Sequence, residues 1–206
     1  MARILYLVRH GQTFFNKEER LGGDSELTSI GIQHAEKLAE SLKDIPFHKI
    51  YCSTLKRSIQ TAEIISRFHQ NTPLISLPAL HEVSSGDMDS LTYDEFNTKF
   101  PHLFTERQKD KYHWAFPNGE SYGDALKRVK NIIDSLEQII LIVGHQAINR
   151  TIIGYILSIP SSKIPYLTIP HEDIYVIDLD TKKCTFLRQG KMQGSYQFDL
   201  SIKADV

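Results

Sequence analysis

Three short polar segments of this sequence carry the side chains that could do chemistry. Arg9 and His10 follow an apolar run, Arg57 lies four residues after Ser53, and His145 comes just after another apolar run. Guanidinium groups bind phosphate oxygens through paired hydrogen bonds, and an imidazole can act as a donor, a base or a nucleophile. Each of these side chains alone is an ordinary structural or surface group. Their occurrence together after three apolar runs favours a phosphate site.

The runs before these residues are predicted strands, and helical patterns separate them. Short continuous apolar runs are typical of strands that are covered on both faces, and apolar residues at helical spacing predict helices. Strands are predicted at 3–8, 48–53, 73–77, 139–143, 174–179 and 183–188, the last two as a hairpin around Asp180 and Thr181. Helices are predicted at 27–42 with Thr28 as N-cap, 55–68, 120–137 and 147–157, and a helical segment at 93–111 is interrupted by Pro101.

The alternation of strands and helices predicts an α/β fold. We expect a three-layer α/β/α sandwich with a mostly parallel central sheet, formed by residues 1–206 as a single domain. Ligands of such sheets bind beyond the carboxyl ends of the strands. Arg9, His10, Arg57 and His145 are therefore expected to meet at one edge of the sheet.

The composition narrows the partners and the compartment. The chain has 206 residues and a formal net charge of −1, so its overall field does not favour nucleic acid or an anionic membrane. No apolar run reaches the roughly 20 residues that span a bilayer, and the N-terminus does not have the pattern of a signal peptide. We expect a cytoplasmic protein in which Cys52 and Cys184 are buried, unpaired thiols, with a disulfide as the alternative. No Cys/His cluster has zinc spacing.

Five segments together resemble the histidine phosphatase superfamily, whose members are phosphoglycerate-mutase-like. "LVRHGQT" resembles its signature, and "STLKRSIQTA", "LHEVSSG", "PNGESYGDALKRV" and "VGHQAINR" resemble its later motifs, in the expected order between residues 4 and 150. The resemblance implies a phosphoglycerate-mutase-like fold, a single histidine phosphatase domain and phosphoryl transfer that requires no metal and no cofactor.

The resemblance also implies a role for each motif residue. His10 would attack phosphorus as a neutral imidazole, and nearby arginines would disfavour its protonated form. Glu82, by itself an ordinary loop glutamate, would protonate the leaving alkoxide and later deprotonate water. Gly11 would give the backbone room to turn near the phosphate. Arg9, Arg57 and His145 would hold the phosphoryl oxygens, and Asn16 and the amide of Gln146 would complete the pocket.

A narrower resemblance, to the fructose-2,6-bisphosphatase domain, extends from residue 4 to about residue 180. It implies hydrolysis of the 2-phosphate of fructose 2,6-bisphosphate. Arg107 and Lys111 lie four residues apart, as do Gln146 and Arg150, and each pair is expected on one helix face. The alternative for Arg107 and Lys111 is a solvated basic face next to Asp110. The residues implied to bind substrate are Asn16, Gly23, Tyr93, Arg107, Lys111, Tyr122, Gln146 and Arg150.

Some features leave the substrate open. Glu26 and Gly144 replace the glycine and the cysteine that are usual in that subfamily, and Lys191 in the unassigned tail 189–206 could lie over the pocket. The alternatives are a broad-specificity phosphatase, a phosphoglycerate mutase or a non-catalytic module that binds a phosphorylated ligand. No lid insert is evident, which favours hydrolysis over mutase activity. We expect a small phosphorylated substrate, no nucleic acid or membrane partner, and a monomer or homodimer.

Overall fold

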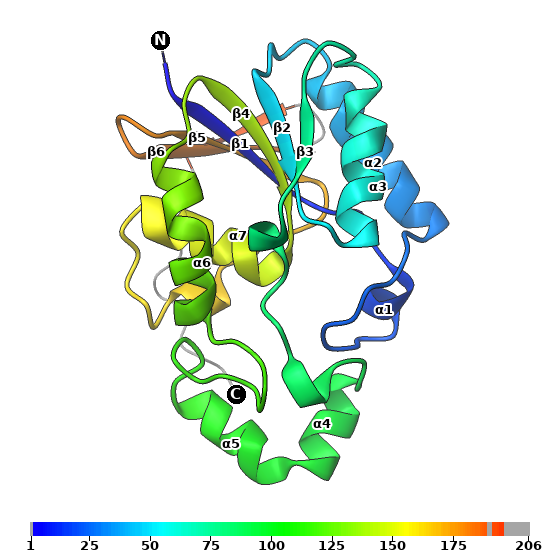
Figure 1. Cartoon of the computed structure of the whole chain (residues 1–206), viewed down its shortest axis with the longest axis vertical. Coiled ribbons are helices and arrows are strands. Elements are labelled where there is room, and N and C mark those ends of the chain that lie inside the picture. The colour runs from blue at the N-terminus through cyan, green and yellow to red at the C-terminus, as the bar shows by residue number, and fades with distance from the viewer. Residues whose placement is uncertain (1, 189–190, 196–206) are drawn as a thin grey trace.

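The computed structural model describes residues 2–188 and 191–195, and these form an α/β/α sandwich around one sheet (Figure 1). The strands are β1 (Ile4–Arg9), β2 (Lys49–Cys52), β3 (Leu74–Ser76), β4 (Ile139–Gly144), β5 (Asp173–Asp178), β6 (Lys183–Arg188) and β7 (Lys191–Ser195). The α-helices are α1 (Phe14–Lys17), α2 (Ser29–Leu42), α3 (Lys56–Ser66), α4 (Tyr93–Lys99), α5 (Pro101–Lys109), α6 (Tyr122–Asp134) and α7 (Gln146–Ile156). Three short 3₁₀ helices are η1 (Pro78–Leu80), η2 (Gly86–Met88) and η3 (Ile164–Tyr166).

The sheet order is β3-β2-β4-β1-β5-β6-β7. The first four strands are parallel to one another, whereas β5, β6 and β7 pair antiparallel. The α/β fold class is confirmed, and the parallel part is the half in which the polar strand ends lie. The hairpin predicted around Asp180 is also confirmed, since Asp178 pairs with Lys183.

Two helix layers bury the two faces of the sheet. In β1, Leu5 and Leu7 pack in a core with α6 and α7, while Val8 packs in a second core with α2 and α3. Figure 1 shows these two helix pairs on opposite sides of the sheet. This two-sided burial is why β1 reads as a continuous apolar run.

The segment 93–111 forms two helices that lie away from the sheet, at the lower edge of Figure 1. Pro101 is the first residue of α5, where its missing N–H costs nothing. A satellite core that includes Phe96 and Phe116, with Phe100 and Phe104 packed against it, stabilises these helices.

Several elements were not predicted from the sequence. The short helix α1 depends on a capping box between Thr13 and Asn16, and β7 adds an edge strand in the tail that had no assigned structure. The remaining tail, at 189–190 and 196–206, lies outside the described residues. Cys52 and Cys184 are buried and free, as expected, and burial raises the pKa of Cys52 to about 11 and that of Cys184 to about 12. No helix in the described ranges is long and apolar enough to cross a membrane.

Candidate active site

The ends of three neighbouring parallel strands bring the predicted side chains together. β4 lies between β1 and β2, with Arg9 opposite Gly144 and Cys52 opposite Val143. His10, Ser53 and His145 therefore follow at one edge of the sheet, where α3 and α7 begin. The expected convergence of Arg9, His10, Arg57 and His145 is confirmed by this register.

His10 is held in one orientation from two sides. Its side chain is buried, and its Nδ1 lies 2.7 Å from the carbonyl oxygen of Gly11. The Nε of Arg57 donates to the Nε2 of His10 over 3.1 Å. These contacts fit an imidazole that is protonated on Nδ1 and carries its free electron pair on Nε2. Nε2 is therefore the nitrogen available to a phosphorus atom.

Arg57 also contacts the second histidine. Its Nε lies 3.2 Å from the Nδ1 of His145, and its Nη1 donates to the carbonyl of Gly23 over 2.7 Å. The Nε2 of His145 lies 2.7 Å from the hydroxyl of Ser53. One guanidinium N–H thus bridges two imidazoles, each of which presents an unprotonated nitrogen to it.

Burial is the main reason why both histidines are neutral. It lowers the pKa of His10 and that of His145 well below the ordinary value for histidine. For His10 the neighbouring His145 and then Arg57 lower the pKa further, and for His145 Arg57 does so. The arginines disfavour the protonated form of His10, as predicted, but their effect on its pKa is smaller than that of burial.

Arg9 has an unused donor next to His10. Its Nη1 donates to the carbonyl of Ile169 over 3.1 Å, while its buried Nε has no hydrogen-bond partner in the structure. Burial lowers the pKa of Arg9 to about 10, so the side chain remains charged at neutral pH. An unpaired buried donor is costly unless a ligand satisfies it, and a phosphoryl oxygen would do so.

Glu82 is held at the N-terminus of α7. Its Oε1 accepts from the backbone N–H groups of Val83, Ala147 and Ile148 at 2.9 to 3.1 Å, and its Oε2 accepts from Ala147 at 3.0 Å. Free N–H groups at the start of a helix favour a negative group there. The carboxyl group is thereby fixed at the wall of the same cavity that His10 lines.

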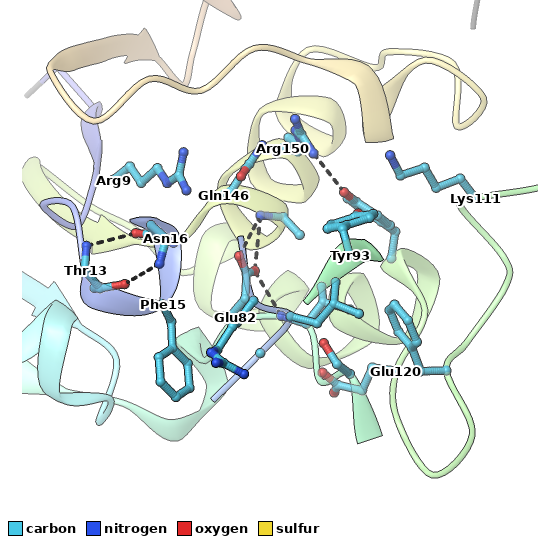
Figure 2. A pocket seen from close by; sticks show the side chains of 18 of the residues that line it. Arg9, Thr13, Phe15, Asn16, Glu82, Tyr93, Lys111, Glu120, Gln146 and Arg150 are labelled. Carbon is cyan, nitrogen blue, oxygen red and sulfur yellow. Dashed lines mark hydrogen bonds between the residues drawn. The ribbon is translucent and has the colours of Figure 1, made fainter. Parts of the chain in front are cut away.

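A single cavity of about 290 Å³ connects the predicted residues. Figure 2 shows Arg9 and Asn16 on one side of it, Arg150 and Lys111 on the other, and Glu82 between them. Its cationic lining residues are Arg9, Arg20, Arg57, Arg107, Lys111 and Arg150, against the carboxylates of Glu82 and Glu120. This surplus of positive charge fits an anionic ligand with more than one charged group.

Most of the residues predicted to bind substrate line this cavity. They are Asn16, Tyr93, Arg107, Lys111, Tyr122, Gln146 and Arg150. His145 lies behind Arg57 and does not line the cavity, and neither does Gly23, whose carbonyl binds Arg57. The backbone of Gly23 has a φ of 69°, and a Cβ there would lie 2.4 Å from the ring of Phe15. Gly23 therefore shapes the site through its backbone.

Arg107 and Lys111 do not lie on a solvated helix face. Arg107 is only 8% exposed and lies over the rings of Tyr93 and Phe116. The expectation that Arg107 and Lys111 share a helix face is wrong, because α5 ends at Lys109. Asp110 then accepts from the backbone N–H of His113, and this turn, not a helix, brings Lys111 to the cavity.

Lys111 and Arg150 have polar surroundings that suit an anion. Burial, followed by the charges of Arg107 and Arg150, lowers the pKa of Lys111 to about 8. Arg150 donates to the carbonyl of Leu167 over 2.6 Å and to the hydroxyl of Tyr122 over 3.2 Å. Gln146 and Arg150 share α7, as predicted.

The sequence reasoning missed His171. Its Nδ1 lies 2.5 Å from the carbonyl oxygen of His10, and the two rings pack edge to face with their centres 5.6 Å apart. Burial lowers the pKa of His171 to about 3, so this contact is made by a neutral ring. The only feature of the sequence that could have indicated His171 is its place just before the strand predicted at 174–179. β5 runs antiparallel to β1, so the start of β5 also lies at this edge of the sheet.

Three further interpretations are settled by packing. A Cβ at Gly11 would lie 2.1 Å from the carbonyl oxygen of Gly31, so Gly11 is required for close contact with α2 and not for a turn near phosphate. Glu26 is exposed and does not line the cavity, and its Oε1 lies 3.8 Å from the Nζ of Lys56. Lys191 begins β7 and does not line the cavity either.

Gly144 has a steric explanation. A Cβ at this position would lie 2.0 Å from the side-chain oxygen of Asn149. The Nδ2 of Asn149 donates to the carbonyl of Val8 over 2.9 Å, which fixes the amide in that space. The glycine and the asparagine are therefore matched to each other.

Comparison with known proteins agrees with the motifs. The family model of the histidine phosphatase superfamily (branch 1) matches residues 5–191. A 6-phosphofructo-2-kinase/fructose-2,6-bisphosphatase of Caenorhabditis elegans is 35% identical over an alignment 204 residues long, and the match covers 90% of this chain and 44% of that protein. The chain therefore spans less than half the length of this relative.

Solved structures, one of them named a phosphatase, have the same fold. The α-ribazole phosphatase of Shigella flexneri has a TM-score of 0.80 and 26% identity, and the match covers 91% of this chain and 96% of that one. The structure of Bacillus stearothermophilus YhfR has a TM-score of 0.77 and 29% identity, with the same two coverages.

Proposed function

Because the chain belongs to the histidine phosphatase superfamily (branch 1), we propose that it removes phosphate from a sugar bisphosphate. The specific substrate proposed is fructose 2,6-bisphosphate, and the products are fructose 6-phosphate and inorganic phosphate. The activity named for the Caenorhabditis elegans relative supports this choice.

One observation carries the proposal. One cavity is lined by His10, Arg9 and Arg57 and also by Arg107, Lys111 and Arg150, and Figure 2 shows Arg9 and Lys111 on opposite sides of it. A bisphosphate has two dianionic groups, so it needs two cationic sites joined by a channel for the sugar. Tyr93 and Tyr122 line the same cavity and would contact the sugar, and the hydroxyl of Tyr122 already accepts from Arg150.

In the first step Nε2 of His10 attacks the phosphorus atom, and the bond from phosphorus to the sugar oxygen breaks. The leaving oxygen takes a proton from Glu82, because a sugar alkoxide is a poor leaving group. Arg9 and Arg57 donate to the phosphoryl oxygens as charge moves onto them. His145 acts through Arg57, whose Nε it contacts. Asn16 is a further donor, since its Oδ1 already accepts from Thr13 and its Nδ2 remains for the ligand.

In the second step water attacks the phosphohistidine. Glu82 accepts a proton from this water, the bond between Nε2 and phosphorus breaks, and inorganic phosphate leaves. His10 returns to its neutral state with Nδ1 still held by the carbonyl of Gly11. The residues named here supply the charge stabilisation themselves, so the proposed steps need no metal ion.

The test is a phosphate-release screen with a trapping experiment. We expect kcat/KM to be highest for fructose 2,6-bisphosphate among sugar bisphosphates, phosphoglycerates and aryl phosphates. A ³²P-labelled substrate should leave an acid-labile, alkali-stable label on the wild type and none on His10→Ala. Wild-type turnover by His10→Ala, without a label on either protein, would exclude the phosphohistidine mechanism.

A broad-specificity phosphatase is the second candidate. It is favoured by the similarity to an α-ribazole phosphatase, which is named for a different phosphate ester. Similar kcat/KM values for chemically unrelated monophosphates would support it. Isomerisation of 2- or 3-phosphoglycerate without phosphate release would instead indicate a mutase, and tight binding with negligible turnover would indicate a binding module.

The remaining expectations concern the chain as a unit. We propose that it acts in the cytoplasm on small phosphorylated molecules, as a single domain that is monomeric or homodimeric. Cell fractionation tests the location, and sedimentation of the purified chain tests the oligomeric state.

A further inference from the structure

Arg128 is a charged side chain that makes four hydrogen bonds near Glu82 and does not line the cavity. It lies on α6 and is only partly exposed. Its Nη1 donates to the carbonyl of Ala79 over 2.6 Å and to the carbonyl of His81 over 3.1 Å. These two carbonyls belong to the segment that leads from η1 to Glu82, so Arg128 fixes the chain directly before the proposed acid.

Glu120 links Arg128 to the backbone that follows Glu82. Arg128 donates to both oxygens of Glu120, with Nε at 3.0 Å and Nη2 at 2.9 Å. The Oε2 of Glu120 accepts from the backbone N–H of Ser84 over 3.2 Å, and the N–H of Glu120 donates to the carbonyl of Ser84 over 3.0 Å. The pair therefore holds residues 79, 81 and 84, which flank Glu82.

Besides Arg128 and Glu120, a hydrogen bond between the side chains of His81 and Thr54 and the packing of Val83 against the core hold this loop. Leu80 is fully buried and anchors η1, but residues 81–85 belong to no helix or strand. The carboxyl group itself must remain able to exchange a proton, so its contacts to Val83, Ala147 and Ile148 cannot alone define the backbone position. Two of the hydrogen bonds of Arg128 hold backbone carbonyls directly, and the other two hold Glu120, which in turn binds the backbone of Ser84. All of them leave the carboxyl group of Glu82 free.

We propose that Arg128 is a positioning residue for the general acid Glu82, acting through the backbone of residues 79–84. This inference rests on the proposed function, in which Glu82 protonates the leaving oxygen. A planar guanidinium can serve two carbonyls and a carboxylate at once, whereas a lysine ammonium cannot reproduce that geometry. Loss of this contact should therefore impair proton transfer and leave the phosphoryl site of His10 intact.

The leaving group of the substrate separates this role from a merely structural one. An alkyl phosphate such as fructose 2,6-bisphosphate needs a proton on the departing oxygen, while the phenolate of p-nitrophenyl phosphate leaves without one. The ratio kcat/KM reports only the steps up to release of the leaving group. It is therefore insensitive to the later hydrolysis of the phosphohistidine, in which Glu82 also takes part.

The experiment measures kcat/KM for both substrates in Arg128→Lys, Glu82→Gln and the double variant. We expect Arg128→Lys to lower the value for the alkyl substrate at least about tenfold and that for p-nitrophenyl phosphate less than about threefold, the pattern of lost general acid catalysis. Glu82→Gln should show the same selectivity with a larger loss. Because Arg128 acts through Glu82, the double variant should be no slower than Glu82→Gln alone.

Two controls address folding. Lys127→Met changes the neighbouring residue of α6, whose side chain is 80% exposed, and should leave both kcat/KM values unchanged. Arg128→Ala with added ethylguanidinium provides a second variant. The added cation should restore activity on the alkyl substrate and have little effect on the aryl substrate.

The outcomes distinguish the two proposals. Equal losses on both substrates in Arg128→Lys, or additive losses in the double variant, would overturn the role of Arg128 even while Glu82→Gln remains selective. If Glu82→Gln itself loses activity equally on both substrates, or if His10→Ala retains activity, the proposed function fails instead.

Discussion

The Nε of Arg57 lies 3.1 Å from the Nε2 of His10, the atom proposed to attack phosphorus. In the free protein the guanidinium thus donates to the electron pair that the reaction needs. An incoming phosphoryl group must take over this donor through its oxygens, which places the phosphorus atom next to Nε2. The same contact adds to the effect of burial in keeping the imidazole neutral, and we expect it to guide the substrate as it binds.

We predict that Arg57→Lys lowers kcat by roughly 100- to 1,000-fold, the usual effect of removing a donor to a developing oxyanion. Lysine keeps the charge but cannot bridge His10 and His145 with one N–H. Steady-state kinetics with fructose 2,6-bisphosphate gives the value. Arg67→Lys, at the exposed C-terminal end of α3, is the matched control and should have wild-type kcat. A similar fall in both variants would contradict a specific role for Arg57.

Arg107→Ala should act mainly on KM, because Arg107 lines the cavity and is proposed to bind the second phosphate, not the one that His10 attacks. We expect KM for a bisphosphate to rise roughly 10- to 100-fold, as for loss of a hydrogen bond to a charged group. KM for p-nitrophenyl phosphate should change little, since this substrate has no second phosphate. Lys109→Ala, on the exposed face of the same helix, is the control. A fall in turnover of the aryl substrate with KM for the bisphosphate unchanged would refute the second-phosphate site.

The pH dependence should reveal Lys111. Its pKa is lowered to about 8, so the side chain is charged below that pH and loses its charge as the pH rises through it. We therefore expect kcat/KM for a bisphosphate to fall above about pH 8 relative to that for an aryl monophosphate. Arginine keeps its charge, so in Lys111→Arg the fall in kcat/KM should occur only at much higher pH. If kcat/KM still falls at the same pH in Lys111→Arg, the fall is due to the titration of another group.

Gly144→Cys should destabilise the fold, because its Cβ needs the space that the amide of Asn149 occupies. Overpacking of this kind costs about 1–3 kcal/mol, measurable by urea unfolding. Gly123→Ala is the control, since a Cβ there meets no atom closer than 3.6 Å.

A second comparison tests the match between residues 144 and 149. Combining Gly144→Cys with Asn149→Ala should cost less than the sum of the two single changes, because the second change makes room for the first. Strictly additive losses would mean that the two residues are independent.

The local patterns of the sequence were sufficient for most of the longer elements and for proposing the catalytic set. Apolar periodicity predicted the strands that end before His10 and His145, and the motifs pointed to Arg9, Arg57 and Glu82, all of which the fold brings to one site. Such features are readable because the period of burial and the order of motifs are properties of short segments. The ends of helices and strands were predicted less accurately. For example, α5 ends at Lys109, before Lys111.

The tertiary structure alone decided which distant groups support these residues. His171 reaches His10 only because β5 runs antiparallel to β1, and Arg128 reaches the carbonyls beside Glu82 only because α6 packs against η1. The reason for Gly11 is likewise a contact with a backbone 20 residues away, at Gly31. The sequence by itself predicted the reacting groups through local motifs. Their orientation depends on contacts between segments far apart in the chain, which no local pattern encodes.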